Sequence, residues 1–185
     1  GSLPYHPFVD LLLSWATIDE ADSEQVGREK LGRLLHSLLA ERTAELAPFV
    51  ARLMGLRLDE EEGRRLAGID VEGMEKLIAR SLREVLIAGA ASRPLVLFFE
   101  DVHWADLSSI QLLLGLLPLA REHAILFLLA ARPDYPQTST RLLAACRERL
   151  ARLHTEITLA RLTARDCGLL LRNLIRHDDR SHTTR

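Results

Sequence analysis

Two short, unbroken apolar runs constrain the fold of this chain more than any other feature. The first spans residues 94–99 and is followed by Glu100 and Asp101, and the second spans residues 124–131 and is followed by Arg132. Short apolar runs bounded by charged residues and proline are typical of strands that are buried on both faces of a parallel sheet. The sequence therefore predicts two buried strands in its second half.

The stretches around these runs have the apolar spacing of helices. This spacing predicts helices over residues 108–121, 139–153 and 164–176, the last with Thr163 as its N-cap. A third, weaker strand candidate spans residues 155–159. The alternation predicts an α/β fold with a parallel sheet of about three strands in this chain. In such sheets, functional residues lie at the carboxyl ends of the strands.

Residues 1–92 differ from the rest of the chain because their apolar residues recur at helical spacing throughout. The longest amphipathic helix is expected from about Val71 to Ala91. The acidic run from Asp59 to Glu62 suits the first turn of a short helix, because a helix N-terminus favours negative charge. We therefore expect a helical segment over residues 1–92 and an α/β part over residues 93–185.

The composition excludes several classes of protein. The 185 residues are 48% hydrophobic and 27% charged, which excludes a disordered chain. The net charge of -2 argues against a nucleic-acid or membrane surface. No apolar run approaches the roughly 18 residues of a membrane span and no secretory signal is visible, so we expect a cytoplasmic protein. Cys146 and Cys167 lack the spacing of a zinc site.

Glu100 and Asp101 form an acidic pair at the position where parallel sheets bind ligands, the end of a buried strand. Paired carboxylates suit Mg²⁺, because this ion prefers hard oxygen ligands and the second carboxylate can orient a water molecule. The alternative is that the two acids merely end the strand and cap the next helix. Asp106, followed by two serines, is the predicted N-cap of that helix.

The run from Glu100 to Asp106, Glu-Asp-Val-His-Trp-Ala-Asp, resembles the Walker B segment of AAA-type and STAND-type signal-transduction ATPases. The likeness is greatest to regulators that join such a module to LuxR-type DNA-binding or adenylate cyclase domains. Residues 3–12 are similar to the segment after the family's second strand, and the helices beyond them to its helical insert. Residues 130–133 resemble the end of the sensor strand, and residues 157–163 the last strand. The resemblance implies part of a P-loop NTPase-type parallel sheet.

The resemblance also implies roles for single residues. Glu100 would hold Mg²⁺, Asp101 would contact the metal and orient the attacking water, and Arg132 would contact the γ-phosphate of ATP. The order Glu-Asp, rather than Asp-Glu, places the shorter side chain in the catalytic position and implies slow hydrolysis, which suits a switch. His103 would contact the nucleotide or a neighbouring subunit, or else serve as a structural hydrogen-bonding residue. Trp104 is expected to pack.

The partners implied by the resemblance are ATP, other domains of the same polypeptide and a second copy of the chain, without direct contact to nucleic acid. The family's phosphate-binding loop, G-x-x-x-x-G-K-[ST] after a strand, is not found. Gly27 to Gly32 and Gly68 to Gly73 have the glycine spacing but lack the Lys-Ser/Thr pair. In the family this loop lies upstream. We therefore expect the central part of a longer ATPase, inactive alone, with exposed apolar sheet surfaces that favour association.

Two other classes of function stay open. One is a protein-interaction module on a degenerate ATPase fold, in which the helices of residues 7–91 bind a partner and the acidic pair is a relic. The other is a metal-dependent hydrolase that uses Glu100, Asp101, His103 and Asp106. The hydrolase is less favoured because no second histidine cluster completes a metal site.

Overall fold

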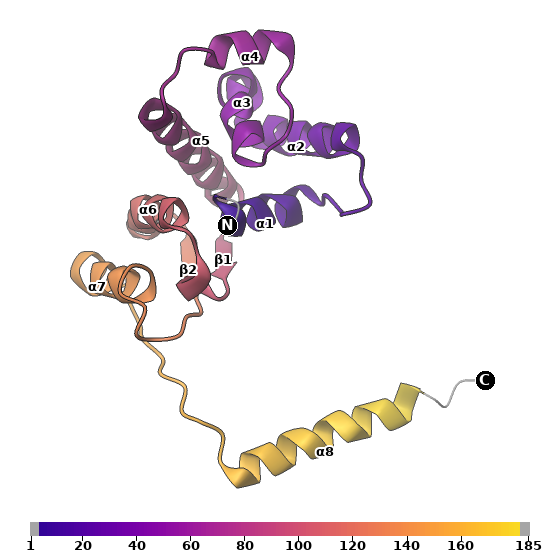
Figure 1. The fold of residues 1–185 in the computed structure, drawn as a ribbon, viewed down its shortest axis with the longest axis vertical. Helices are drawn as coiled ribbons and strands as arrows, with labels where there is room; N and C mark the ends of the chain where they lie inside the picture. The colour runs from indigo at the N-terminus through magenta and orange to yellow at the C-terminus, as the bar shows by residue number, and fades with distance from the viewer. Residues whose placement is uncertain (1–3, 182–185) are drawn as a thin grey trace. The chain divides into compact units, whose positions relative to one another are not determined.

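The computed structural model describes residues 4–181, with the side chains of residues 4–173, and it divides the chain into two units, residues 1–154 and 155–185. The first unit begins with helices, as Figure 1 shows. These are α1 (His6–Ala16), α2 (Glu24–Leu39), the 3-10 helix η1 (Ala40–Arg42), α3 (Thr43–Leu53), α4 (Glu60–Leu66) and α5 (Val71–Ser92). The predicted helical segment over residues 1–92 is confirmed for the residues described.

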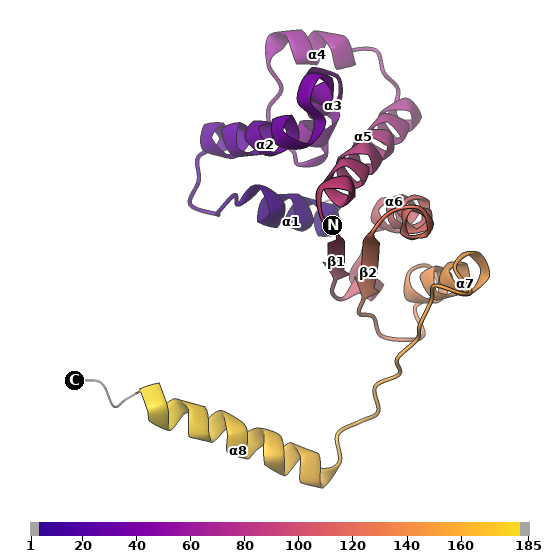
Figure 2. The ribbon, with the colours of Figure 1, turned by 180° about the vertical axis from the view of Figure 1, so that it is seen from behind.

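The remainder of the first unit carries a small parallel sheet. Its elements are β1 (Leu95–Phe99), η2 (Val102–Trp104), α6 (Leu107–Leu116), η3 (Leu117–Arg121), β2 (Ile125–Leu129) and α7 (Ser139–Arg149). The two strands lie side by side (Figure 2), with Leu95 opposite Ile125 and Phe99 opposite Leu129. The two main strands and the helix between them are therefore confirmed as predicted.

Local side-chain chemistry fixes where several helices begin. Asp59 accepts a hydrogen bond from the backbone N–H of Glu62 at 2.8 Å, and the Glu62 carboxylate accepts one from the backbone N–H of Asp59 at 2.9 Å. This reciprocal pair is a capping box, and it satisfies N–H groups that have no partner within the helix. Asp70 accepts from the backbone N–H of Gly73 at the start of α5. The acidic run therefore opens α4, as the sequence predicts.

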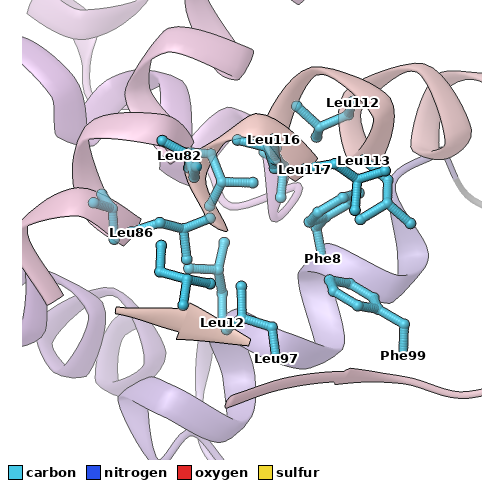
Figure 3. Packing of buried hydrophobic residues seen from close by; sticks show 14 of the residues in the cluster. Phe8, Leu12, Leu82, Leu86, Leu97, Phe99, Leu112, Leu113, Leu116 and Leu117 are labelled. Atoms are coloured by element: carbon cyan, nitrogen blue, oxygen red, sulfur yellow. The ribbon is translucent and has the colours of Figure 1, made fainter. Parts of the chain in front are cut away.

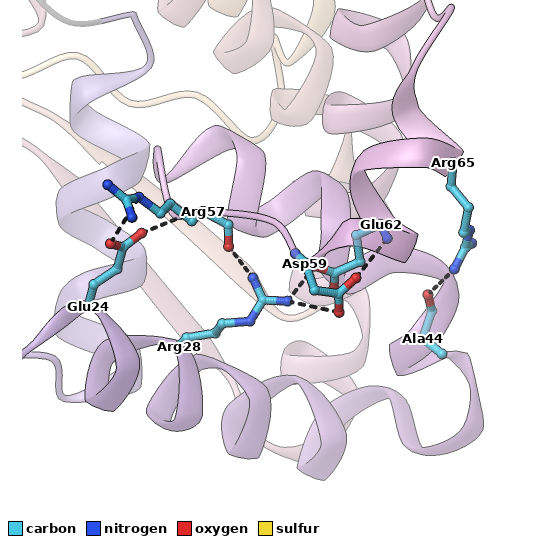
Figure 4. Close-up of polar contacts among 7 residues, drawn as sticks. All are labelled: Glu24, Arg28, Ala44, Arg57, Asp59, Glu62 and Arg65. Carbon is cyan, nitrogen blue, oxygen red and sulfur yellow. Dashed lines mark hydrogen bonds and ion pairs between the residues drawn. The ribbon is translucent and has the colours of Figure 1, made fainter.

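Polar contacts hold α4 against α2 and α3, as Figure 4 shows. The Arg28 guanidinium donates to the Arg57 carbonyl and to the Glu62 carboxylate, and lies 3.7 Å from Asp59. Arg65 donates to the carbonyl of Ala44 at 3.3 Å. Since Leu66 is the buried residue of α4, these contacts supplement a small apolar contribution to its docking.

One apolar core joins the helices to the sheet (Figure 3). Buried leucines of α5 and α6 surround Leu12 and Phe8 of α1 and the inward-facing Leu97 and Phe99 of β1. The rings of Phe8 and Phe99 meet edge to face, with centroids 5.2 Å apart. Within α5, a Cβ at Gly89 would lie 2.5 Å from the Trp15 ring, so only glycine fits this contact between α1 and α5.

The prediction that both faces of the sheet are buried is wrong for the residues described. Side chains alternate along each strand, and only one set enters the core. On the other face, large exposed fractions remain for four apolar residues: Val96 63%, Phe98 50%, Leu126 58% and Leu128 49%. The reason is that the helices of the first unit cover one face only. This bare apolar face agrees with the expectation of exposed sheet surfaces.

The predicted third strand, residues 155–159, is also wrong. In the second unit, residues 155–163 have no regular secondary structure, and Ile157 and Leu159 are 78% and 88% exposed. Alternating threonine and apolar residues favour a strand, but a strand also needs a neighbour to pair its N–H and C=O groups. No such pairing forms here among the described residues. The sheet described therefore has two strands, not about three.

The second unit contains α8 (Ala164–Ser181). The Thr163 hydroxyl accepts a hydrogen bond from the backbone N–H of Asp166 at 3.2 Å, which confirms Thr163 as the N-cap. The helix continues beyond its predicted end at residue 176. None of the helices in the described part of the chain combines the length and the apolar character that crossing a membrane requires.

Candidate functional site

The two strands end at the same edge of the sheet, and this edge carries the residues that the sequence singles out. Backbone pairing continues past the strands, because Ala130 N–H donates to the Phe99 carbonyl at 2.9 Å and Val102 N–H donates to the Ala130 carbonyl at 3.1 Å. The acidic pair after β1 is thereby held beside the segment after β2 that carries Arg132. The structure thus brings Glu100, Asp101 and Arg132 to one edge.

The side chains of Glu100 and Asp101 are both exposed. Within the described residues, the nearest titratable group to either carboxylate is the His103 ring, whose Nδ1 lies 3.8 Å from Asp101 Oδ1, beyond hydrogen-bond distance. Asp101 has a left-handed backbone, with φ 49°, which is unfavourable for a residue with a Cβ atom. Its side chain makes no helix-capping hydrogen bond. The alternative that this pair caps the next helix is therefore not supported.

His103 is only 3% exposed and connects the two segments. Its Nδ1 accepts a hydrogen bond from the backbone N–H of Arg132 at 3.3 Å, and its carbonyl accepts one from the Thr138 hydroxyl at 3.1 Å. Because Nδ1 is an acceptor, the neutral ring carries its proton on Nε2, which is buried and has no hydrogen-bond partner among the described residues. These contacts support the structural role for His103.

Aromatic rings enclose this histidine. The His103 ring centroid lies 5.0 Å from that of Trp104 and 4.8 Å from that of Tyr135, and the two larger rings are 5.5 Å apart. Trp104 packs on one side only, since it remains 66% exposed. The sequence reasoning did not include Tyr135 or Thr138. The signal that could have found them is the proline-flanked turn that follows the second apolar run.

Asp106 is fully engaged in structural contacts. One carboxylate oxygen accepts from the backbone N–H of Ser109 at 2.9 Å, which makes Asp106 the N-cap of α6 as predicted. The other accepts from the Ser109 hydroxyl at 2.5 Å and from the backbone N–H of Tyr5 at 3.2 Å. With His103 buried as well, the four residues of the hydrolase hypothesis do not assemble into a metal site.

The edge can support a metal ion only together with other ligands. In the part of the chain that the structure describes, no group of three or more His, Cys, Asp or Glu side chains is placed to hold a metal. Mg²⁺, however, is commonly held by one or two carboxylates together with phosphate oxygens and water. Exposed Glu100 and Asp101 fit that use, and exposed Arg132 fits contact with an anion.

The two glycine pairs with phosphate-loop spacing lie outside any strand-to-helix loop. Gly27 and Gly32 are both within α2, and Gly73 is within α5. Gly68 lies in the turn between α4 and α5. All four glycines precede β1, so neither pair forms the loop after a strand that wraps a phosphate. Their rejection from the sequence is confirmed.

Comparison with known proteins assigns no family to this chain. It matches no protein-family model, and searches of curated proteins and of solved structures find no significant similarity.

Proposed function

We propose that this chain is the central part of a STAND-type regulatory ATPase, a switch whose state depends on bound nucleotide. The observation that carries the proposal is the edge of two adjacent parallel strands, where an exposed acidic pair and an exposed arginine lie together. The resemblance of residues 100–106 to a Walker B segment supplies the nucleotide, ATP.

We assign a role to each candidate residue at this edge of the sheet. Glu100 and Asp101 hold Mg²⁺ directly or through water, and Asp101 also orients the water that attacks the phosphate. Arg132 donates hydrogen bonds to the γ-phosphate. His103 is a positioning residue, since its ring fixes the backbone of Arg132. Mg²⁺, when bound with ATP, neutralises phosphate charge. The short Asp101 side chain suits slow turnover.

The phosphate loop and the output are supplied by other parts of the same polypeptide in this proposal. A LuxR-type DNA-binding domain or a cyclase domain is the output that the resemblance favours, and a second copy of the chain is a further partner. The segment described here makes no contact with nucleic acid itself. Transcription regulation or signalling in the cytoplasm is the corresponding cellular role.

The test is a titration of a fluorescent ATP analogue, with Mg²⁺, into this chain and into a version extended upstream by one βα unit of about 30 or more residues. We expect binding only by the extended version, and weaker binding after Glu100→Ala or Asp101→Ala. Glu61→Ala, which removes an exposed acid of α4, is the matched control and should bind normally. Absence of binding by both versions would overturn the proposal.

A second candidate function is a non-catalytic protein-interaction module on a degenerate ATPase fold. The observation that favours it is the bare apolar face of the sheet, formed by Val96, Phe98, Leu126 and Leu128. In the hypothesis drawn from the sequence, the helices of residues 7–91 bind the partner, and this sheet face is a second candidate surface. An upstream-extended protein that binds no nucleotide but loses association after Phe98→Ser would favour this module over the switch.

A further inference from the structure

A separate cavity of about 500 Å³ lies in the helical part of the first unit. It is formed where the start of α1, the end of α3, the first turns of α5 and the first turn of α6 meet, and it includes none of the candidate residues at the sheet edge. Its volume falls within the range of about 300–1,000 Å³ that small-molecule sites occupy. Most of its wall is apolar, contributed by Val9, Leu53, Met54, Ile69, Met74 and Ile78.

Three polar side chains converge on this apolar wall: Tyr5, Glu75 and Ser108. All three are partly buried. Burial raises the pKa of the Tyr5 hydroxyl, and the negative charges of Glu75 and Asp106 raise it further, whereas a hydrogen bond with Ser108 acts in the opposite direction. Burial is the largest of these effects, and the contribution of Glu75 shows that its carboxylate lies close enough to act on the phenol.

Glu75 is the acidic side chain of the cavity wall that acts on Tyr5. Among the described residues, no hydrogen bond or ion pair to its carboxylate is found, although it is partly buried. The other charged lining residues lie at the exposed rim. Arg52 and Asp70 are of opposite sign and both exposed, and His6 pairs with Asp10 at 3.0 Å. Among the charged side chains of the described cavity wall, Glu75 is thus a partly buried acid without a cationic side-chain partner.

We propose that this cavity binds a small amphipathic amine, with its apolar body against the apolar wall and its ammonium group on the Glu75 carboxylate. The Tyr5 and Ser108 hydroxyls accept further hydrogen bonds from the same ammonium group. A partly buried carboxylate gains most from a cationic donor, which explains the preference for an amine over an alcohol or an acid. Met54 and Met74 allow the wall to adapt to apolar groups of different shape.

The cavity also touches the loop that precedes α6. Tyr5 donates its backbone N–H to Asp106, the N-cap of α6, and Ser108 lies in the first turn of that helix. A ligand bound between Tyr5 and Ser108 therefore contacts two residues beside Asp106. Asp106 is where the loop that begins at Glu100 ends and α6 begins. Ligand binding in this cavity requires no nucleotide, so the inference does not rest on the proposed function.

The test compares three probes of nearly equal shape, 4-phenylbutylamine, 4-phenylbutanol and 4-phenylbutyrate, titrated into the full chain by calorimetry or ligand-observed NMR. We expect the amine to bind at least about tenfold more tightly than the acid. Glu75→Gln should weaken the amine by about tenfold and remove its advantage over the alcohol. Glu72→Gln, on the same helix and paired with exposed Lys76, is the matched control and should bind like the unchanged chain.

Cavity filling supplies a second variant that leaves Glu75 in place. Met74→Trp should abolish binding of all three probes, while circular dichroism verifies that each variant retains its helices. Equal binding of amine and acid, no saturable binding of the amine, or undiminished binding by Glu75→Gln or Met74→Trp would overturn the proposal. None of these outcomes depends on whether the sheet edge binds ATP.

Discussion

Two acidic segments of this chain have opposite relations to the fold. In the segment from Asp59 to Glu62, the acids form a capping box and meet the Arg28 guanidinium. In the pair Glu100 and Asp101, both carboxylates are exposed, and Arg or Lys partners are absent from the described contacts. The comparison shows that a run of acidic residues does not by itself indicate a binding site. Acids that the fold leaves without a structural task are the better candidates for binding.

The largest expected effect concerns Arg28, the cation of the first segment. Arg28→Ala should lower the free energy of unfolding by about 1–3 kcal/mol, because it removes charge-assisted hydrogen bonds to the Arg57 carbonyl and to Glu62. Urea unfolding followed by circular dichroism measures the change. Arg33→Ala, which removes an exposed arginine of the same helix, should change stability by less than about 0.5 kcal/mol. Equal losses in both variants would contradict the structural role of Arg28.

A smaller loss is expected at Asp59. Asp59→Ala removes the side-chain half of the capping box and should lower the free energy of unfolding by about 1 kcal/mol. Asp59→Asn retains an acceptor and should lose less. Thermal and urea unfolding of the two variants measure the difference, and a stability equal to that of the unchanged chain in both would show that α4 does not depend on this cap.

Asp101→Gly, unlike the two preceding substitutions, should not lower the free energy of unfolding. Glycine adopts a positive φ without a Cβ clash, so stability should stay unchanged or rise by up to about 1 kcal/mol. Glu100→Gln should change stability by less than about 0.5 kcal/mol. Chemical denaturation measures both. If either variant destabilised the protein as much as Asp59→Ala, Glu100 and Asp101 would have a structural role. The difference between the two acidic segments would then be contradicted.

Asp22 is a further acid with a structural partner, and the pH dependence of stability tests that pairing. A hydrogen bond from Lys30 Nζ, at 2.6 Å, together with one from the Asp19 backbone, lowers the pKa of Asp22 below 3.8. Because the folded pKa is the lower one, the contribution is present above the unfolded pKa and is lost as pH falls through the folded value. The stability difference between the unchanged chain and Asp22→Asn should therefore vanish in acid. Urea unfolding across pH measures it, and a constant difference would contradict this pairing.

The sequence predicts best the features that depend on neighbouring residues. Asp106 and Thr163 are predicted correctly as N-caps, because each needs only an acceptor side chain a few residues before the N–H it binds. The strands β1 and β2 follow from short apolar runs between breakers. The acidic pair and Arg132 reach one edge because parallel neighbouring strands end together.

Features that depend on distant parts of the chain were not predictable in the same way. Whether Val96 and Phe98 are covered depends on which helices pack on that face. Whether residues 155–159 form a strand depends on pairing with another strand, and no such pairing is found among the described residues. The hydrogen bond between His103 and the Arg132 backbone spans 29 residues, and no local pattern encodes it. The left-handed backbone of Asp101 likewise cannot be predicted from its residue type.

The hydrogen bond from Tyr5 to Asp106 joins groups 101 residues apart in the chain. Closing a loop of this length costs chain entropy before the contact can form. During synthesis the N-terminal residues emerge first, so the first turn of α1 must wait until Asp106 has left the ribosome before this clasp can close. The cavity beside Tyr5 therefore cannot be complete before the chain has been synthesised as far as α6.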